Sequence, residues 1–570
     1  MQAIIIIIIS IISLISAYLF YSRYISKKIL LIDPDTPTPA HLLEDGVDYV
    51  PSNRYVLFGH HFASIAGLSP ILGPAIAVIW GWLPALIWII FGSIFAGAVH
   101  DFTALEISVR HKGKSIGLIA GDYLGPRARI LFLLIIFFLL ALAMGVFVFI
   151  ISILFSEAGG GVRMYPEAVI PTAALMVIAV GVGLLVYKYK ASLLYVSIIG
   201  ILLSLFSILI GIKYPIDFIN RDQWGYILIV YAFIASILPV WILLQPRDYI
   251  NSFQLYLGMF LLVIGIFIKK PEMNFPAVNH TATDLPSIFP FLFITIACGA
   301  ISGFHNLVSS GTTARQLDKM NDARVIGYGG MLAEAMLGIL AVIAAVIGIS
   351  YNQGLAEAYT SFGAANKLGI KLNVFVEGAA YSMTGLGIPH KFGATFISVI
   401  IVAFGMTTLD SGTRLLRFNF ESMGKTLNIK PLENRHLASF LAVLAIGYFA
   451  FMKIGGQPAG LSLWLLFGTT NQLLAAMGLL TVSVYLYFRK RPTLFVVIPM
   501  VFILVVTVWA MILNIKNNLL SETVSYPFVI TSGLILIIAI WLVIEAIIAY
   551  KKFSKSENVM SEQVKGSIGE

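Results

Sequence analysis

Apolar stretches of about 20 residues recur along the whole of this chain, and they limit its possible folds more than any other feature. Of the 570 residues, 59% are hydrophobic and only 11% are charged, whereas a typical soluble domain carries about 25% charged residues. A soluble fold could not hide so much apolar surface. We therefore expect an all-α polytopic membrane protein, because a helix satisfies its own backbone hydrogen bonds within lipid.

The number of membrane spans follows from counting these stretches. Each span needs about 20 mostly apolar residues, and this criterion predicts about 15 transmembrane helices. The sequence between Ser350 and Lys391 is too polar for a span, and we expect it to hold a half-helix, Glu377 to Ile388, at the outer surface. The predicted spans are centred near Ile12, Ala66, Ile94, Leu142, Val177, Leu202, Ile234, Met259, Thr295, Ile339, Ile401, Leu444, Leu473, Leu504 and Ile538.

The distribution of positive charge tests this count. If the first span begins outside and the spans alternate in direction, 27 of the 37 Lys and Arg residues fall at inner ends. Cytoplasmic loops of membrane proteins carry such an excess. We therefore expect a multi-pass protein of the inner (plasma) membrane, with its N-terminus outside and its C-terminus in the cytoplasm. The net charge of +9 then belongs to the cytoplasmic face rather than to a nucleic-acid partner.

Two predicted spans are interrupted near their middle. The first holds Gly-Leu-Ser-Pro and Gly-Pro within residues 67–74, and the second holds Gly-Ala-Ile-Ser-Gly-Phe-His at residues 299–305. Gly and Pro weaken a helix, and the freed backbone groups can face only protein or a water-filled cavity. Two discontinuous helices in corresponding halves of a chain indicate the binding site of a secondary transporter. Alternatively, each break is only a kink or a close helix contact.

The directions of the two broken helices predict an internal symmetry. The first runs from inside to outside, and the second, seven helices later, runs from outside to inside. An inverted repeat of five helices requires that relation. We expect the repeats to form a core over residues 54–488. An extra transmembrane helix at residues 1–31, retained rather than cleaved as a signal peptide, precedes it, and two C-terminal transmembrane helices at 489–551 and a cytoplasmic tail at 552–570 follow.

Several segments of the sequence resemble the carbon starvation protein A family. They are "GHHFASIAGLSPILGP" from Gly59, "GWLPALIWIIFGSIFAGAVHDF" from Gly81, "LPVWILLQPRDYINSF" from Leu238, "FPFLFITIACGAISGFHNLVSSGTT" from Phe289, "RVIGYGGMLAEA" from Arg324, "TTLDSGTRLLRF" from Thr407 and "LWLLFGTTNQLLAA" from Leu463. The resemblance implies a transporter of small organic nutrients, with pyruvate and peptides as the family's substrates. It also implies the LeuT-like fold of the amino acid, polyamine and organocation superfamily.

The chain departs from the family pattern in two respects. The first motif usually reads Gly-Ala-Gly-Pro, where this sequence has Gly-Leu-Ser-Pro at residues 67–70. The chain is also short for the family, with fewer C-terminal spans. Both departures bear on the identity of the substrate more than on transport itself.

The two breaks hold the candidate substrate site. Ser69 and Pro70 suit the first turn of a half-helix, whose positive end attracts a carboxylate, and Phe304 could close over the ligand. Alternatively, Ser69 only caps a kink, and Gly299 with Gly303 only allows close helix packing. The predicted substrate-binding residues are Gly67, Leu68, Ser69, Pro70, Gly73, Gly299, Ser302, Gly303, Phe304 and His305.

Hydroxyl and carboxylate oxygens within an apolar run at residues 407–411 indicate ion coupling, because such ligands suit a hard cation. In LeuT-like transporters the corresponding helix supplies hydroxyls to a sodium site opposite the first broken helix. Asp410 could instead carry a proton together with His61 or His305, since histidine titrates near neutral pH. As a third alternative, Asp410 forms a salt bridge with Arg414. The predicted ion-coupling residues are His61, Ala66, Thr407, Thr408, Asp410 and Ser411.

Further ionisable residues lie near membrane depth, where such groups are functional candidates by default. We interpret Arg247 and Asp248 as a cytoplasmic gate or hinge rather than as substrate ligands. The other candidates are His60, His100, Asp101, Glu106 and Glu334.

These patterns favour a secondary active transporter that imports a small carboxylate-bearing nutrient, pyruvate or short peptides, by cation symport during nutrient limitation. We predict protons as the cation. The alternatives are a sodium-coupled amino acid or peptide transporter, a channel, and a membrane nutrient sensor on a transporter scaffold. The sequence contains no nucleotide-binding, hydrolase or zinc-protease motif and a single cysteine, Cys298. We therefore expect no enzymatic activity, no cofactor and no resident metal.

Overall fold

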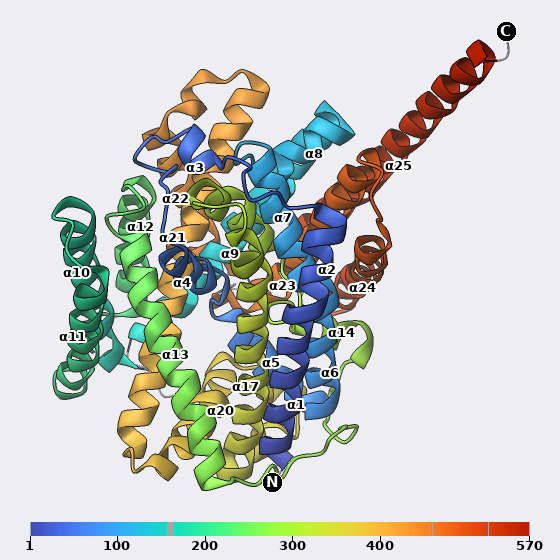
Figure 1. The fold of residues 1–570 in the computed structure, drawn as a ribbon. Coiled ribbons are helices and arrows are strands. Elements are labelled where there is room, and N and C mark those ends of the chain that lie inside the picture. The colour runs from blue at the N-terminus through green and yellow to red at the C-terminus, as the bar shows by residue number, and fades with distance from the viewer. Residues whose placement is uncertain (1, 157–164, 455–456, 459, 522–523, 569–570) are drawn as a thin grey trace.

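The computed structural model describes residues 2–156, 165–454, 457–458, 460–521 and 524–568. Most of them belong to helices that run side by side in one bundle (Figure 1). The expected polytopic all-helical architecture is thus confirmed. Eleven of the described helices are long and apolar enough to cross a membrane, or up to 12 if a bent pair counts as one span.

The predicted count of 15 spans stays a prediction, because three of the expected spans are shorter than a full crossing. The helices at Ile234 and Leu444 have 17 residues each, and the helix at Thr295 has eight. A helix rises 1.5 Å per residue, so 17 residues cover only about 26 Å of a hydrocarbon core about 30 Å thick.

The first part of the chain runs from the N-terminus to the ninth helix. Its first span is continuous from Gln2 to Leu30. The elements are α1 (Gln2–Ser16), α2 (Ser22–Tyr24), α3 (Pro39–Leu42), α4 (Arg54–Ile65), α5 (Ser69–Ala77), a 3-10 turn at Val78–Trp80, α6 (Trp82–Gly92), α7 (Ala98–Arg110), α8 (Ile116–Leu124) and α9 (Pro126–Phe155), with π-helical turns at Ala17–Tyr21, Ile25–Leu30 and Ser93–Gly97.

The middle of the chain contains the second broken span and the helices on either side of it. Its elements are α10 (Val169–Gly183) with short turns at Pro166–Ala168 and Leu184–Lys188, α11 (Leu193–Lys213), α12 (Arg221–Ile237), α13 (Leu244–Lys269), α14 (Ile288–Thr295), α15 (Gly303–Val308), a π-helical turn at Ser309–Thr313, α16 (Ala314–Gln316), another π-helical turn at Arg324–Tyr328, and α17 (Gly329–Tyr351).

The last part of the chain adds three long helices of the core and the two C-terminal helices. Its elements are α18 (Gln353–Ala358), α19 (Phe362–Ala365), α20 (Leu368–Met383), a turn at Thr384–Leu386, α21 (His390–Leu427), a turn at Lys430–Glu433, α22 (Arg435–Phe451), a two-stranded hairpin of β1 (Lys453–Ile454) and β2 (Gln457–Pro458), α23 (Gly460–Phe488), α24 (Leu494–Leu519) and α25 (Tyr526–Ile568). Helix α25 thus includes the expected tail up to Ile568, and residues 569–570 lie outside the described residues.

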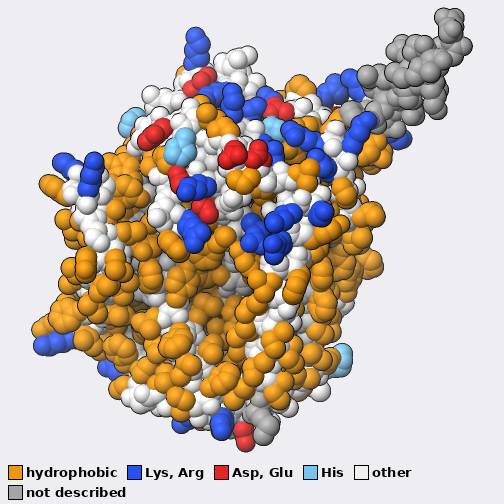
Figure 2. Space-filling model, in the orientation of Figure 1, with side chains coloured by type: hydrophobic (Ala, Val, Ile, Leu, Met, Phe, Trp, Pro, Cys, Tyr) orange, Lys and Arg blue, Asp and Glu red, His pale blue; other side chains and the backbone are white. Residues whose placement is uncertain are grey.

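The helices sort into a buried centre and an apolar periphery. Helices α9, α17, α21 and α23 are almost completely enclosed by the protein, whereas α1, α10, α11, α24 and α25 expose most of their apolar side chains. Figure 2 shows this exposed apolar surface as a broad belt, with most Lys and Arg side chains gathered at one end of the molecule. The N-terminus lies at the opposite end of the bundle from the C-terminus (Figure 1).

Helix α20 differs from the expected half-helix at the outer surface. It begins nine residues earlier than predicted, at Leu368, and it packs along α17 with most of its residues buried. Glycines make this contact possible, because a Cβ atom added at Gly378 would overlap the carbonyl oxygen of Ala344, and one at Gly348 would overlap that of Val374. Small residues allow two helix backbones to approach closely within a membrane.

An ion-pair cluster ties the loop before α4 to the C-terminal half of α21. Arg414 Nη1 donates to Asp48 Oδ1 at 2.7 Å, and Arg417 Nη2 donates to both carboxylate oxygens at 3.2 Å. Arg414 also donates to the carbonyl oxygens of Ala235 and Leu238 at the C-terminus of α12, where the helix dipole favours a cation. The predicted alternative of an Asp410–Arg414 salt bridge is therefore not the pairing that the structure contains.

This cluster generates a prediction about stability. Burial alone would raise the pKa of Asp48, but the guanidinium groups of Arg417, Arg414 and Arg315 lower it to about 2. We expect Asp48→Asn to destabilise the protein by about 3 kcal/mol at neutral pH, because it removes the carboxylate that two buried guanidinium groups share and leaves Arg417 with only its longer contact to Glu421. Since the unfolded pKa is about 3.9, this contribution is complete above about pH 4 and is lost as the pH falls through about 2.

Thermal unfolding of the purified protein in detergent measures this effect. The matched control is Asp122→Asn, because Asp122 pairs with Lys114 and Arg129 at the surface and should contribute less than about 1 kcal/mol. Equal losses of stability in the two variants, or a pH-independent difference between wild type and Asp48→Asn, would show that the cluster does not hold the loop.

Candidate functional site

The first break separates α4 from α5, which meet at an angle of 47°. The helical hydrogen bonds of α4 end at Ala66, and Gly67 N donates to Ile65 O at 2.9 Å. Pro70 lies in the first turn of α5, where its missing N–H leaves no donor unpaired. Ser69 lies within this turn rather than before it, and its buried Oγ has no hydrogen-bond partner among the described residues.

The second break lies between α14 and α15, at residues 296–302, and side chains from other helices replace its lost helical hydrogen bonds. Asn471 of α23 accepts a hydrogen bond from Phe304 N at 2.8 Å. Glu334 of α17 accepts one from Gly299 N at 3.1 Å. Gly299 has a φ of +92°, a region that L-residues with a Cβ rarely adopt, so the break requires glycine here. Protein groups thus satisfy the backbone that could not face lipid.

The two breaks lie against each other in the centre of the bundle. A Cβ atom placed on Gly299 would be 3.9 Å from Pro70, and one placed on Gly73 would be 2.4 Å from the carbonyl oxygen of Thr295. Between the breaks lies a small, nearly closed cavity, of which only about 10 Å³ is open to the centre of a water-sized molecule. Its lining comes from both breaks and from α9, α21 and α23, and consists of Ile65, Gly67, Ser69, Ala143, Met144, Phe147, Cys298, Phe304, Thr408 and Phe467.

The predicted substrate residues fall into two groups relative to this cavity. Gly67, Ser69 and Phe304 line it directly. The others support the breaks. At the first break, Leu68 packs against Gly405, Pro70 faces Gly299, and Gly73 abuts Thr295. At the second break, Ser302 accepts a hydrogen bond from Asn471 at 3.0 Å, Gly303 abuts the carbonyl oxygen of Asn471, and His305 faces Asp101. Sequence reasoning did not identify the aromatic wall residues Phe147 and Phe467, because their positions within uniformly apolar helices give no distinguishing signal.

Hydroxyl groups of α21 approach the first break, as expected from the sequence. Thr408 Oγ1 donates to Ser64 O at 3.4 Å, and Ser411 Oγ lies 3.0 Å from Ser64 Oγ. Ser64 was not included among the candidate ion ligands predicted from the sequence, although its hydroxyl group two residues before the break could have indicated this position. Thr407 instead faces Asn251 of α13 at 3.4 Å. Ala66 is buried at the break itself, and His61 Nδ1 lies 2.9 Å from Thr313 Oγ1.

Asp410 faces away from the cavity and belongs to a buried charge cluster with the predicted gate residues. Arg247 pairs with Asp410 and with Asp248. Tyr231 OH donates to Asp410 Oδ2 at 2.5 Å, and His60 Nδ1 lies 2.6 Å from Asp248 Oδ2. The cluster joins α4, α12, α13 and α21. Removing one partner from such a buried pair leaves an uncompensated charge, which typically costs about 3–5 kcal/mol.

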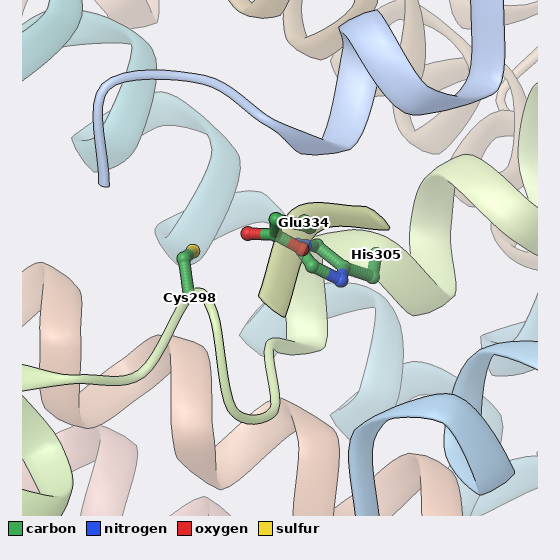
Figure 3. A group of neighbouring side chains, drawn as sticks. All are labelled: Cys298, His305 and Glu334. Atoms are coloured by element: carbon green, nitrogen blue, oxygen red, sulfur yellow. The ribbon is translucent and has the colours of Figure 1, made fainter. Parts of the chain in front are cut away.

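A second buried cluster lies behind the second break. His305 Nδ1 is 3.0 Å from Asp101 Oδ2, and the other oxygen of Asp101 is 2.8 Å from His100 Nδ1. On its far side, His305 Nε2 is 3.1 Å from Glu334 Oε2. In Figure 3 the Glu334 carboxylate lies between the side chains of His305 and Cys298. Glu106, another ionisable candidate, lies outside this cluster and pairs with Arg110.

Three side chains of this cluster are close enough to hold a metal ion. One ligand atom each from Cys298, His305 and Glu334 lies within 4.8 Å of the other two. Zinc accepts this combination of sulfur, nitrogen and oxygen ligands. However, the carboxylate already has one oxygen on Gly299 N and the other beside His305, so the negative charge has partners without an ion.

Comparison with known proteins places the chain among membrane transporters. The family model described as carbon starvation protein CstA matches residues 2–361 and 349–510. The peptide transporter CstA of Bacillus subtilis is 33% identical over 612 residues, which cover 100% of both chains. The peptide transporter CstA of Escherichia coli is 34% identical over 83% of this chain and 75% of its own length. The pyruvate/proton symporter BtsT of Escherichia coli is 33% identical over 88% and 80%, respectively.

Among solved structures, a mutant of the manganese transporter of Eremococcus coleocola aligns with 90% of this chain and 99% of its own. The TM-score is 0.44 and the sequence identity 14%.

Proposed function

Because the chain belongs to the carbon starvation protein CstA family, we propose that it is a secondary active transporter which imports a small carboxylate-bearing nutrient, pyruvate or a short peptide, by proton symport. The resemblance seen in the sequence is confirmed, and the names of the relatives indicate a transporter rather than an enzyme. We further propose that this import takes place during nutrient limitation.

One observation carries the proposed substrate site. The cavity between the two breaks opens onto the first turn of α5, where the buried Oγ of Ser69 has no hydrogen-bond partner. A buried polar group without a partner is unfavourable, and a ligand that accepts or donates a hydrogen bond there removes this cost. The first turn of a helix also carries a partial positive charge, which attracts an anion. A carboxylate satisfies both features.

The size of the cavity favours a small substrate. Pockets for drug-sized ligands usually enclose about 300–1,000 Å³, whereas only about 10 Å³ of this cavity is open to the centre of a water-sized molecule, so its bulky apolar walls must move to admit even a small substrate. Pyruvate, with one carboxylate and a methyl end, suits a site lined by Ser69 and by aromatic walls. A peptide would require a larger movement of the wall formed by Phe147, Phe304 and Phe467.

The arrangement of the breaks supports alternating access around this cavity. In transporters with inverted repeats, discontinuous helices bind substrate near the middle of the membrane, and parts of the protein rock around the site. We propose a LeuT-like core over residues 54–488, with the charge cluster of Arg247, Asp248 and Asp410 as an inner gate that joins α13 to α21.

A sodium-coupled amino acid or peptide transporter is the second candidate, and one observation favours it. Oxygen atoms of Ser64, Thr408 and Ser411 converge at the first break, and neutral oxygen ligands suit a hard cation. Proton coupling is favoured by the concentration of buried histidines and carboxylates around the second break, since such groups mark proton relays within membranes.

Transport measurements in liposomes distinguish the two candidates. We expect the purified wild-type protein to accumulate labelled pyruvate when a pH gradient, acidic outside, is imposed in sodium-free buffer. Collapse of the gradient by a protonophore should reduce uptake to the level of protein-free liposomes, while counterflow continues. Uptake that requires sodium and ignores the pH gradient would support the second candidate and refute proton symport.

The cavity itself is tested by adding a single methyl group. A Cβ atom at Gly67 would lie 2.4 Å from Thr408 Oγ1 and 3.3 Å from Phe147. We expect Gly67→Ala to lower pyruvate counterflow at least about tenfold, because it fills the site and displaces Thr408. The matched control, Gly447→Ala, places its Cβ in ordinary contact at 3.8 Å from Ile229 and should transport normally.

Both proteins should be monodisperse and unfold at similar temperatures, so that the loss is specific to transport. Normal counterflow by Gly67→Ala would show that the break is only a structural kink. Gly303 is a poorer position for this test, since its Cβ would collide with the backbone of α23 at Asn471 and Ala475.

We also propose that the N-terminus lies outside and the C-terminus in the cytoplasm of the inner membrane, as the excess of Lys and Arg at one end suggests. Single cysteines at two exposed positions, Gln2 and Lys552, in a Cys298→Ser background test this orientation. In intact cells, an impermeant thiol reagent should label Gln2→Cys and not Lys552→Cys until the membrane is opened. The reverse pattern, or equal labelling, would refute the proposed orientation.

A further inference from the structure

Glu334 lies directly behind the cavity at which the substrate is proposed to bind. It is fully buried on α17, and its carboxylate is within 4.8 Å of Cys298 Sγ. Cys298 itself lines the cavity. A substrate in the cavity is therefore separated from the Glu334 carboxylate by little more than one side chain.

The two carboxylate oxygens of Glu334 make different contacts. Oε1 accepts the hydrogen bond from Gly299 N at 3.1 Å and so holds the unwound segment of the second break in place. Oε2 lies 3.1 Å from His305 Nε2 and has no well-aligned hydrogen-bond donor. The carboxylate thus connects a backbone group of the break to a titratable side chain.

A substrate carboxylate and an ionised Glu334 would place two negative charges in the same buried region. Two carboxylates separated by little more than one side chain in a site of low dielectric still repel each other, and this repulsion favours binding of a proton to one of them. An anionic substrate is also attracted by the N–H groups of the breaks, one of which Glu334 already occupies. A protonated Glu334 removes the repulsion and holds Gly299 less tightly.

The groups around Glu334 can supply that proton. His305 of α15 and Cys298 of the break face it directly, and Asp101 of α7 lies behind His305. His100 adjoins Asp101, and His61 of α4 interacts electrostatically with Asp101 and His305. The described residues around Glu334 include no Lys or Arg side chain that pairs with it.

We propose that Glu334 is the proton-binding residue that couples substrate binding to proton uptake, with His305 as the positioning residue that exchanges the proton with it. This inference rests on the proposed function. Asp410 is less suited to the task, because Arg247 and Tyr231 both hold its Oδ2 and it faces away from the cavity.

Binding of pyruvate to the purified full-length protein as a function of pH tests this coupling. If one proton must bind with each substrate, the Kd of the wild type should rise by up to about tenfold per pH unit above the range in which Glu334 titrates. Glu334→Gln resembles the protonated side chain and keeps an oxygen for Gly299 N. We expect its Kd to be independent of pH.

Transport by the same variant provides the second readout. In liposomes, Glu334→Gln should perform pyruvate counterflow but should not accumulate pyruvate under a pH gradient. The matched control is Glu357→Gln, which removes an exposed carboxylate on α18 and should behave as wild type in both assays.

A second variant keeps the test decisive if Glu334→Gln fails to fold. Glu334→Asp remains titratable, but its carboxylate is withdrawn by one methylene group, about 1.5 Å, and can no longer reach Gly299 N. We expect the pH dependence of its Kd to be at least about threefold weaker per pH unit than that of the wild type.

Three results would overturn the inference. The first is a wild-type-like pH dependence in Glu334→Gln or Glu334→Asp. The second is loss of coupling in Asp410→Asn with coupling intact in Glu334→Gln. The third is tight zinc binding that Cys298→Ser, His305→Asn and Glu334→Gln each abolish, which would identify the cluster as a metal site. Absence of pyruvate binding and transport by the wild type would instead refute the proposed function.

Discussion

A backbone N–H group that loses its helical partner inside a membrane needs another acceptor within the protein, and much of this structure answers that requirement. Asn471 and Glu334, from α23 and α17, accept N–H groups at the second break, Trp88 of α6 donates to the carbonyl oxygen of Ile296 within it, and Gln472 donates to that of Phe293 in the last turn of α14. These partners explain why α17 and α23 lie at the buried centre of the bundle. They also make the breaks sensitive to the chemical state of their neighbours, because Glu334 accepts the hydrogen bond of Gly299 only while an oxygen lone pair is available.

Buried charges are arranged in two separate clusters, and the separation suggests two tasks. Arg247 links Asp410 and Asp248 across helices α13 and α21, so that two carboxylates share one permanent cation, and His60 lies beside Asp248. Around the second break, by contrast, the charged partners of Asp101 and Glu334 among the described residues are histidines, whose charge depends on a proton, and no Lys or Arg pairs with them. A cluster with a fixed cation can hold helices together or open as a gate. A cluster with titratable partners can take up and release a proton near neutral pH.

The sequence was informative about the breaks and much less so about their partners. Gly67, Pro70 and Gly299 interrupt their helices as predicted, because the conformational effects of Gly and Pro are local. Glu334 and Asn471 lie 35 and 172 residues from Gly299, and no local pattern indicates such contacts. Asp410 illustrates the same limit. The four-residue spacing favoured a pair with Arg414. Tertiary packing instead places Arg247 beside Asp410 and Asp48 beside Arg414. The sequence count also included the helices near Ile234 and Leu444, but their ends depend on tertiary contacts, and α12 and α22 have only 17 residues each.

The central claim is that the two breaks together form one substrate site, and the most direct measurement is a cryo-electron microscopy structure of the protein with bound pyruvate. We expect density for the substrate carboxylate within hydrogen-bond distance of Ser69 Oγ at the first turn of α5, with the methyl end against Phe304. Density at another position, with the cavity between Gly67 and Cys298 still closed by its apolar walls, would contradict it.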